Sequence, residues 1–385
     1  MTDSTILSRR NFCQLAALGG TAALLARSPT AFAYASHQPK LELVAESPHN
    51  LWNSIVVLPD GRKFSGMPRW KGFEETPSVV QILGDGSLQP FPGHGWNSWT
   101  PGADRRQHFI CVNALNCFDG KTLWAVDQGV TPGEQAAAEG AQKLVQLDAD
   151  TGRILRNLSF GTDIMPPGAL FNDLRIRDEW VYVTDSGLGA IVVINLKTGK
   201  ALRRLAGSPT TKQVRPKLGR GNRPMLIDGK PAQTQADPIE LSPDGEWLYY
   251  QPASGPLYRV PTAALRDTSL SEQALEARIE YVYDTPTLGG TAIDDRGNII
   301  LGEADVPRIR VLTPDGSLRF LLEDDRLWGV DAMYITRDRY LYMPISQVPN
   351  LPWLQGPGGN PDLVKLPFQI YRIKLPDYIG APLHV

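Results

Sequence analysis

The sequence predicts an all-β protein, and three observations support this fold class. Beyond residue 40, the chain is strand-like nearly throughout, with short apolar stretches between turns. Glycine and proline number 36 and 32, as expected where many short strands are joined by tight turns. One hairpin unit also recurs six times: an apolar strand, a turn with Asp plus Gly or a polar equivalent, and a strand with a bulky centre.

The spacing of this repeat predicts the architecture. The centres of the second strands lie 60, 58, 67, 51 and 42 residues apart. They are Phe64, Trp124, Tyr182, Tyr249, Ile300 and Tyr342. A period of this size, with about four strands in each, is typical of a propeller blade. Six units therefore predict a six-bladed β-propeller, and a two-sheet sandwich is the less favoured alternative.

The two ends of the repeat region predict how the ring of blades closes. The stretches "KLELVAES" at residues 40–47 and "FQIYRIKL" at residues 368–375 both have strand character. Pairing them in the last blade would remove the free strand edges that a closed ring must avoid. We therefore expect residues 36–385 to form one propeller domain.

The first 35 residues have a different composition. Arg9 and Arg10 precede a stretch of small and apolar residues, and small residues suited to cleavage follow at Ala33 and Ala35. This is the pattern of a twin-arginine export signal, with an amphipathic N-terminal helix as the alternative. The stretch is too short and too rich in Gly and Ala for a good membrane anchor. We therefore expect residues 1–35 to engage the twin-arginine export machinery, which places the protein in the periplasm or outside the cell.

Composition and cysteine content narrow the function classes. A formal net charge of −2 and 42% hydrophobic residues are typical of a soluble globular protein, and they argue against nucleic acid as a partner. After removal of the signal, only Cys111 and Cys117 remain. They form either a disulfide across a hairpin end or two buried thiols. Two cysteines alone do not make a four-ligand zinc site.

Two long segments interrupt the repeat. Residues 206–236 are rich in Gly, Pro, Lys and Arg, and residues 346–367 have no strand pattern. Connectors of this length are usually functional or disordered, so the basic one either attracts an anionic ligand or is a solvated loop. Aromatic residues near the first two units either form a wall above the channel or fill gaps between blades. They are Trp70, Phe73, Trp96 and Trp99.

A ring of polar residues is predicted at the channel mouth. The first strand of each blade lines the channel, so the residue at its start faces the mouth. Alignment of the units on their turns places Asn or Asp there in blades 1, 3, 4 and 6. These residues are Asn53, Asn172, Asp237 and Asp331. The aligned positions are Cys111 or Val112 in blade 2 and Gly289 or Gly290 in blade 5.

Three kinds of chemistry suit this ring. Amide and carboxylate oxygens are ligands for Ca²⁺ or Mg²⁺, so calcium is the one cofactor that the ring suggests. The same groups bind a polar organic ligand, or supply a carboxylate as general base. The structural alternative is that each Asn or Asp caps its connector by bonding backbone amides. The sequence has no nucleophilic triad, phosphate-binding loop or zinc motif.

Several blocks resemble the yellow/major royal jelly protein family. They lie in family order between residues 45 and 345, and include "PRW" at 68–70, "LWAVDQG" at 123–129 and "FNDLRIRDEWVYVTDSG" at 171–187. The resemblance implies a secreted six-bladed propeller. Yellow-like relatives are linked to melanin-pathway chemistry on catechol-derived indoles, other members bind small biogenic amines in the channel, and the royal jelly members serve partly as nutrients. No catalytic residues follow from the resemblance.

A more distant similarity is to the gluconolactonase-type calcium propellers. Those have an acid in blade 1, Asn in blades 3 and 4, and Asp in blade 5. The corresponding residues here are Asn53, Asn172, Asp237 and Gly289. Only Asn172 keeps its type, and Asp331 is the residue that would compensate for the lost ligands. This similarity implies metal-assisted lactone hydrolysis as a second function.

These observations predict a protein that binds a small polar or aromatic metabolite. Asp237 and Asp331 would pair with a cationic group, while Asn53 and Asn172 fix its orientation. One alternative is an enzyme, either a metal-assisted lactonase-like hydrolase whose metal ligands are these four residues, or an isomerase of catechol-derived rings. Another is a non-catalytic scaffold in which the polar ring is structural.

Overall fold

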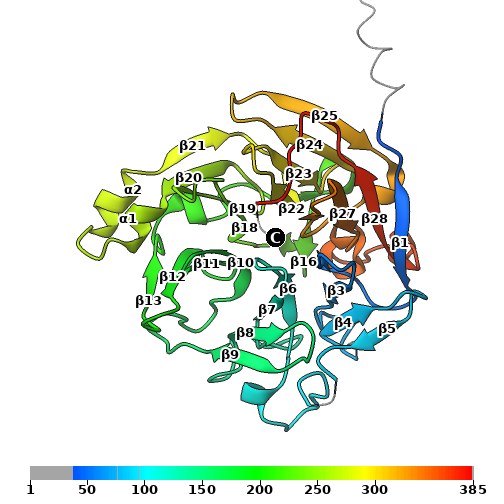
Figure 1. The fold of residues 1–385 in the computed structure, drawn as a ribbon, viewed down its shortest axis with the longest axis horizontal. Helices are drawn as coiled ribbons and strands as arrows, with labels where there is room; N and C mark the ends of the chain where they lie inside the picture. Colours follow the sequence, from blue (N-terminus) through cyan, green and yellow to red (C-terminus); the bar gives the residue numbers. More distant parts are fainter. Residues whose placement is uncertain (1–37, 76, 94, 384–385) are drawn as a thin grey trace, which may run out of the picture. The chain divides into compact units, whose positions relative to one another are not determined.

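The computed structural model describes residues 38–383 apart from residues 76 and 94. The chain divides into two units, Met1–Gln38 and Pro39–Val385. The predicted export signal belongs to the first unit and lies outside the described residues. In the second unit, six four-stranded sheets surround a central channel (Figure 1). The predicted six-bladed propeller is therefore confirmed.

Each of the first five blades is a sheet of four consecutive antiparallel strands. Blade 1 contains β2 (Val56–Val57), β3 (Lys63–Gly66), β4 (Val79–Ile82) and β5 (Leu88–Pro90). Blade 2 contains β6 (Val112–Asn116), β7 (Thr122–Asp127), β8 (Lys143–Asp148) and β9 (Ile154–Leu158). Blade 3 contains β10 (Phe171–Arg177), β11 (Trp180–Asp185), β12 (Ala190–Asn195) and β13 (Ala201–Arg204).

Blade 4 differs by a helical insertion before its outer strand. It contains β18 (Ala236–Leu241), β19 (Trp247–Pro252), β20 (Leu257–Pro261) and β21 (Glu280–Tyr283), with α1 (Thr262–Arg266) and α2 (Glu272–Glu276) inserted before β21. Blade 5 contains β22 (Leu288–Ile293), β23 (Ile299–Glu303), β24 (Arg308–Leu312) and β25 (Leu318–Glu323). Three short 3-10 helices lie between blades or beside the channel, at η1 (Arg105–Gln107), η2 (Pro209–Thr211) and η4 (Asp325–Leu327).

The last blade closes the ring with strands from both ends of the unit. It contains β26 (Tyr334–Ile335), β27 (Tyr340–Pro344), β28 (Phe368–Lys374) and β1 (Glu42–Ser47). β1 pairs antiparallel with β28, with Glu42 opposite Arg372. An ion pair of 2.9 Å also joins these two side chains. The predicted pairing of the two end strands is therefore confirmed.

Apolar packing between neighbouring blades holds the ring together. Five of the six predicted second-strand centres are buried, as Phe64, Tyr182 and Ile300 illustrate at 1% exposure or less, whereas Tyr249 is half-buried. β11 and β12 are apolar on both faces because a blade packs against a neighbour on each side. Burial of one Val or Ile side chain stabilises the fold by about 1.5–3 kcal/mol, so many such contacts give a rigid frame for the channel.

A β-bulge recurs near the start of the inner strand in blades 2 to 5. The pairing with the second strand shifts around Asn113 in β6, Asn172 in β10, Asp237 in β18 and Gly289 in β22. A bulge inserts an unpaired residue and re-aims its side chain. The repeated bulge therefore turns one residue per blade toward the channel mouth.

The two long connectors form a lid over this mouth, defined as residues 206–236 and 346–367. The first contains η3 (Arg220–Asn222) and two short hairpins, β14 (Leu218–Gly219) with β15 (Arg223–Pro224), and β16 (Leu226–Ile227) with β17 (Lys230–Pro231). The second contains η5 (Val348–Asn350), η6 (Pro352–Leu354) and η7 (Pro361–Leu363). Met225 and Leu354 share one buried cluster, and the Gly356 amide donates to the Leu226 carbonyl at 3.1 Å.

The C-terminal segment lies at the other end of the channel. Figure 1 shows the last described residues running toward the centre of the ring of blades. The Asp295 amide donates to the Ala381 carbonyl at 2.9 Å, and Asp294 forms a bridge with Pro382. Leu383 lines a small cavity of about 70 Å³ beneath the channel core. The C-terminal segment therefore packs against the end of the channel that lies away from the lid.

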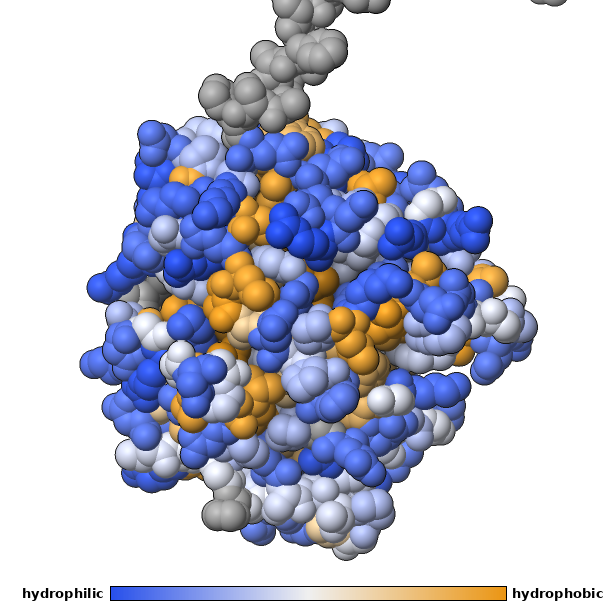
Figure 2. Space-filling model, turned by 90° about the vertical axis from the view of Figure 1, so that its right-hand side faces the viewer, coloured by the Kyte–Doolittle hydropathy of each residue, from blue (hydrophilic) through white to orange (hydrophobic). Residues whose placement is uncertain are grey.

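The outer surface is mainly hydrophilic on the side where β1 and β28 lie. Figure 2 shows hydrophobic side chains there in small groups separated by hydrophilic ones. Small groups of this kind are ordinary on soluble proteins. No helix among the described residues combines the length and the apolar character needed to span a bilayer.

Candidate functional site

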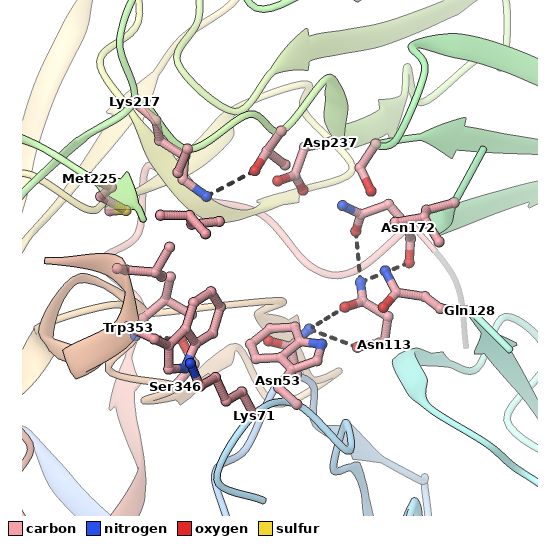
Figure 3. Close-up of a pocket in the computed structure, with 18 of the residues that line it drawn as sticks. Asn53, Lys71, Asn113, Gln128, Asn172, Lys217, Met225, Asp237, Ser346 and Trp353 are labelled. Atoms are coloured by element: carbon pink, nitrogen blue, oxygen red, sulfur yellow. Dashed lines mark hydrogen bonds between the residues drawn. The ribbon is translucent and has the colours of Figure 1, made fainter. Parts of the chain in front are cut away.

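A cavity of about 450 Å³ lies between the channel mouth and the lid. The four residues predicted from the sequence all line this cavity: Asn53, Asn172, Asp237 and Asp331. They come from blades 1, 3, 4 and 6, and the close-up in Figure 3 shows three of them, labelled, around one space. The structure therefore brings the whole predicted set together.

Of the two residues predicted for blade 2, Cys111 lines the cavity and Val112 does not, and a third residue, Asn113, supplies the ring side chain. Asn113 occupies the ring position, whereas Val112 pairs with Asp127 inside the sheet. The bulge causes the difference, because it inserts Asn113 between the paired residues Val112 and Ala114. A sequence signal existed: Asn113 precedes its turn residue Asp119 by six positions, as Asn172 precedes Asp178.

Blade 5 leaves a gap in the ring. Gly289, one of the two predicted residues, lines the cavity at this position. A Cβ atom on Gly289 would lie 2.2 Å from the Val330 carbonyl oxygen, so the backbone of blade 6 excludes a side chain here. The polar ring, as we use the term below, therefore consists of five side chains. They are Asn53, Asn113, Asn172, Asp237 and Asp331.

The three asparagines form a directional chain of hydrogen bonds (Figure 3). Asn53 Nδ2 donates to the Asn113 carbonyl at 2.7 Å and to Asn113 Oδ1 at 3.3 Å. Asn113 Nδ2 in turn donates to Asn172 Oδ1 at 2.8 Å. The Asn172 side chain then hydrogen-bonds Asp237. This chain joins blades 1 to 4 and fixes the orientation of the amides, which are buried.

The two carboxyl groups of the ring are reluctant to ionise. Burial raises the pKa of Asp237 to about 7, while the Lys217 ammonium limits the rise. Burial also raises the pKa of Asp331 well above its usual range, and the negative charge of Asp237 raises it further. The Ala332 amide donates to Asp331 Oδ1 at 3.0 Å. The cavity floor therefore resists two negative charges at once.

A lysine from the lid faces the same two acids. Lys217 Nζ donates to Thr234 Oγ1 at 2.9 Å (Figure 3). Burial lowers the pKa of Lys217, and the charges of Asp237 and Asp331 act in the opposite direction. The sequence analysis described residues 206–236 as a basic connector but did not single out Lys217, because nothing local shows which of its lysines turns inward.

Apolar side chains from the lid complete the walls. Met225, Trp353 and Leu354 line the cavity, together with Trp70 from the loop after β3. Of the four predicted wall aromatics, Trp70 is the one that lines it. The others pack elsewhere: Phe73 against Phe368, Trp96 against Phe109, and Trp99 beneath the Arg69 guanidinium. Trp353 was missed because its segment has no periodic pattern.

A charged network lies beneath the ring. Arg175 donates to Asp173 Oδ2 at 2.7 Å and, through two nitrogens, to Glu240 at 2.9 Å each. Asn116 Nδ2 also donates to Asp173 Oδ1 at 2.8 Å, and Thr291 Oγ1 to Glu240 at 2.8 Å. The consecutive pair Asn172 and Asp173 is thus divided between the ring above and this network below.

Both cysteines of the propeller are free and buried. Cys111 lines the large cavity, whereas Cys117 lines the small cavity below the channel core. They lie at opposite ends of β6, and the disulfide alternative is not realised. Burial raises the pKa of Cys111 to about 12 and that of Cys117 to about 11. Both thiols are therefore poor nucleophiles.

The polar ring as arranged does not fit a calcium ion held by protein ligands. Ca²⁺ takes about six to eight oxygen ligands. Gly289 supplies no side chain, Asn113 Oδ1 and Asn172 Oδ1 already accept ring amides, and the Lys217 ammonium shares the space. Within residues 38–383, apart from 76 and 94, no group of three or more His, Cys, Asp or Glu side chains is placed to hold a metal.

Fold and site together define a six-bladed propeller with a lidded cavity over a polar channel mouth. Residues 119–351, more than half of the chain, match the sequence profile of the major royal jelly protein family. The chain belongs to this family, which confirms the resemblance drawn from the sequence blocks. No curated protein sequence matches it.

Solved structures share the propeller fold at low sequence identity. A calcium-binding protein, regucalcin, from Agrobacterium tumefaciens is 14% identical, with a TM-score of 0.52 over 89% of this chain and 98% of its own. A gluconolactonase from Xanthomonas campestris is 12% identical, with a TM-score of 0.53 over 90% of this chain and 93% of its own. Likeness at this level supports the fold alone.

Proposed function

We propose that the protein binds a small organic molecule between the polar ring and the lid. The polar end of the ligand, an ammonium-type group, lies against Asp237 and Asp331. Its apolar or aromatic body lies against Trp353 and Met225. The observation that carries this proposal is one cavity of about 450 Å³ that combines two carboxyl groups with apolar walls. Ligand pockets have volumes of about 300–1,000 Å³ and the same combination of surfaces.

The raised pKa values supply a reason for selectivity. Asp237 and Asp331 ionise reluctantly because burial disfavours the charge of both, and the negative charge of Asp237 further disfavours that of Asp331. A cation placed between them stabilises the ionised forms. The hydrogen bonds that it donates are then charge-assisted, and such bonds contribute about 1.5–3 kcal/mol each.

We expect the protein to bind 2-phenylethylamine at least about tenfold more tightly than 2-phenylethanol, which has the same shape without the charge. Tryptophan fluorescence reports the binding, because Trp70 and Trp353 line the cavity. The preference should disappear in Asp237→Asn and persist in Asp244→Asn, an exposed change in the same blade. Equal affinity for the two compounds would overturn the proposal.

Catalysis without a metal is the second candidate, and one observation favours it. A carboxyl group with a pKa of about 7 is matched to proton transfer near neutral pH, and Asp237 has this value. An isomerase of catechol-derived rings, as the family resemblance implies, needs such a base. Incubation of the protein with a catechol-derived compound checks this candidate, because conversion of the compound changes its absorbance with time.

Metal-assisted lactone hydrolysis is the weaker alternative, supported by the fold likeness to a gluconolactonase. Because the ring does not fit the ion, we expect Ca²⁺ to leave the melting temperature nearly unchanged. A specific ion at about 100 times its dissociation constant would add roughly 2.7 kcal/mol of stability. A shift of that size, reversed by EDTA and absent in Asp237→Ala, would replace our proposal with a metal site.

A further inference from the structure

The cavity presents separated charges of both signs to a ligand. Lys217 comes from the lid, Asp237 from the start of β18 and Asp331 from blade 6, and all three line the same space. In the described part of the chain, no carboxylate lies within the 4.0 Å ion-pair distance of the Lys217 ammonium. The cation and the two acids therefore influence each other through the cavity without contact.

The backbone on both sides of Lys217 is fixed. Its carbonyl accepts the Met225 amide at 2.9 Å, which ties it to the lid hairpins. The next amide, that of Leu218, donates to Thr287 Oγ1 at 2.8 Å, which ties it to blade 5. The ammonium itself is held by Thr234 Oγ1. Lys217 is thus a positioned group of the site, and its other two N–H bonds remain for a ligand.

Other positively charged side chains that line the cavity also favour a ligand with an anionic group. Arg69 and Lys71, from the loop after β3, also line the cavity. Figure 3 shows Lys71 on the side of the pocket away from Asp237. The remaining acid of the lining, Glu134, already pairs with Arg105 at 2.7 Å. A ligand that carries only an ammonium group thus meets repulsion from these cations, and one that carries only a carboxylate meets Asp237.

We propose that the ligand is a zwitterion, an α-amino acid with an apolar or aromatic side chain. Its ammonium group lies between Asp237 and Asp331, its carboxylate accepts hydrogen bonds from Lys217 Nζ, and its side chain contacts Trp353. This inference rests on the proposed function, because it names the chemical class that the same cavity takes. Lys217 is then the residue that distinguishes amino acids from simple amines.

The test compares two probes on four proteins. The probes are L-phenylalanine and 2-phenylethylamine, which differ by the carboxylate. The proteins are the wild type, Lys217→Met, Lys217→Arg and Lys230→Met, and the last removes an exposed cation of the lid that does not line the cavity. We expect the wild type to bind phenylalanine at least about tenfold more tightly than the amine. Lys217→Met should abolish or reverse this preference, whereas Lys217→Arg and Lys230→Met should largely keep it.

The outcomes separate this inference from the proposed function. If the wild type binds neither probe, the proposed function fails, and the inference fails with it. If the wild type binds the amine as tightly as phenylalanine or more tightly, the proposed function stands and the zwitterion is excluded. That comparison needs no variant, so misfolding of Lys217→Met does not weaken it. A preference that survives unchanged in a folded Lys217→Met excludes Lys217 as the carboxylate-binding residue.

Discussion

Arg175→Met is expected to lower the free energy of unfolding by about 3–5 kcal/mol. The Arg175 guanidinium is buried and holds Asp173 and Glu240 through short hydrogen bonds. Methionine fills much of the same volume but carries no charge, so two buried carboxylates lose their cation. Removal of one partner from such a network costs more than the network contributes, because the remaining charges have no solvation. Urea unfolding at about neutral pH measures the loss.

Arg177→Met is the matched control for this experiment. Arg177 ends the same strand, is less buried and donates to the Pro243 carbonyl at 3.2 Å. We expect its replacement to cost about 1 kcal/mol or less. Equal losses in the free energy of unfolding from the two substitutions would show that the buried charged network does not stabilise the fold.

Asp237→Asn is expected to stabilise the protein above neutral pH, by about 2–4 kcal/mol. The pKa of Asp237 is about 7 in the folded protein and close to 3.8 when unfolded. The folded state therefore binds the proton more tightly. As pH rises from about 4 to about 7, the wild type loses stability, and above pH 7 the loss is complete. Asparagine never ionises, so the variant avoids this loss.

Urea unfolding at about pH 4 and about pH 8.5 checks the sign. The gain from Asp237→Asn should be present at the higher pH and absent at the lower one. Asp244→Asn provides the control, because Ser242 and backbone amides lower the pKa of Asp244 and its carboxylate contributes stability above its pKa. Its replacement should therefore act in the opposite direction. If Asp237→Asn is no more stable than the wild type at the higher pH, ionisation of Asp237 does not destabilise the folded protein.

The expected destabilisation of the unliganded protein by Asp237 is consistent with a role of this residue in ligand binding. Groups that serve a ligand are often unfavourable for the unliganded fold. The variant that gains stability is thus also the one expected to lose its preference for the amine. A structural cap would behave in the opposite way, since its removal lowers stability.

The fold was predictable because its signals are local. Each blade repeats one hairpin whose turn chemistry lies within a few residues, as in the Asp244–Gly245 turn of blade 4. The pairing of β1 with β28 was predictable from the requirement that a ring leaves no free edge. Four ring residues followed from their distance to these turns. Asn113 was missed because the alignment placed Cys111 or Val112 at this position, although Asn113 lies six residues before its turn residue Asp119, the same distance as Asn172 from Asp178.

The lid was beyond prediction from the sequence because its contacts are non-local. Met225 and Leu354 meet across more than a hundred residues of chain, and neither segment has a periodic pattern. Which of several lysines enters the cavity depends on the path of the connector, and only Lys217 is tied to both the hairpins and blade 5. The pKa shifts likewise depend on burial, which the sequence does not contain.

A crystal structure of the protein grown with L-phenylalanine tests the central claim most directly. We predict density for the amino acid in the cavity between the polar ring and the lid. Its ammonium group should lie within hydrogen-bonding distance of Asp237 and Asp331, and its carboxylate within reach of Lys217 Nζ. A cavity that contains only water at saturating phenylalanine, or a metal ion coordinated by the ring, would contradict the claim.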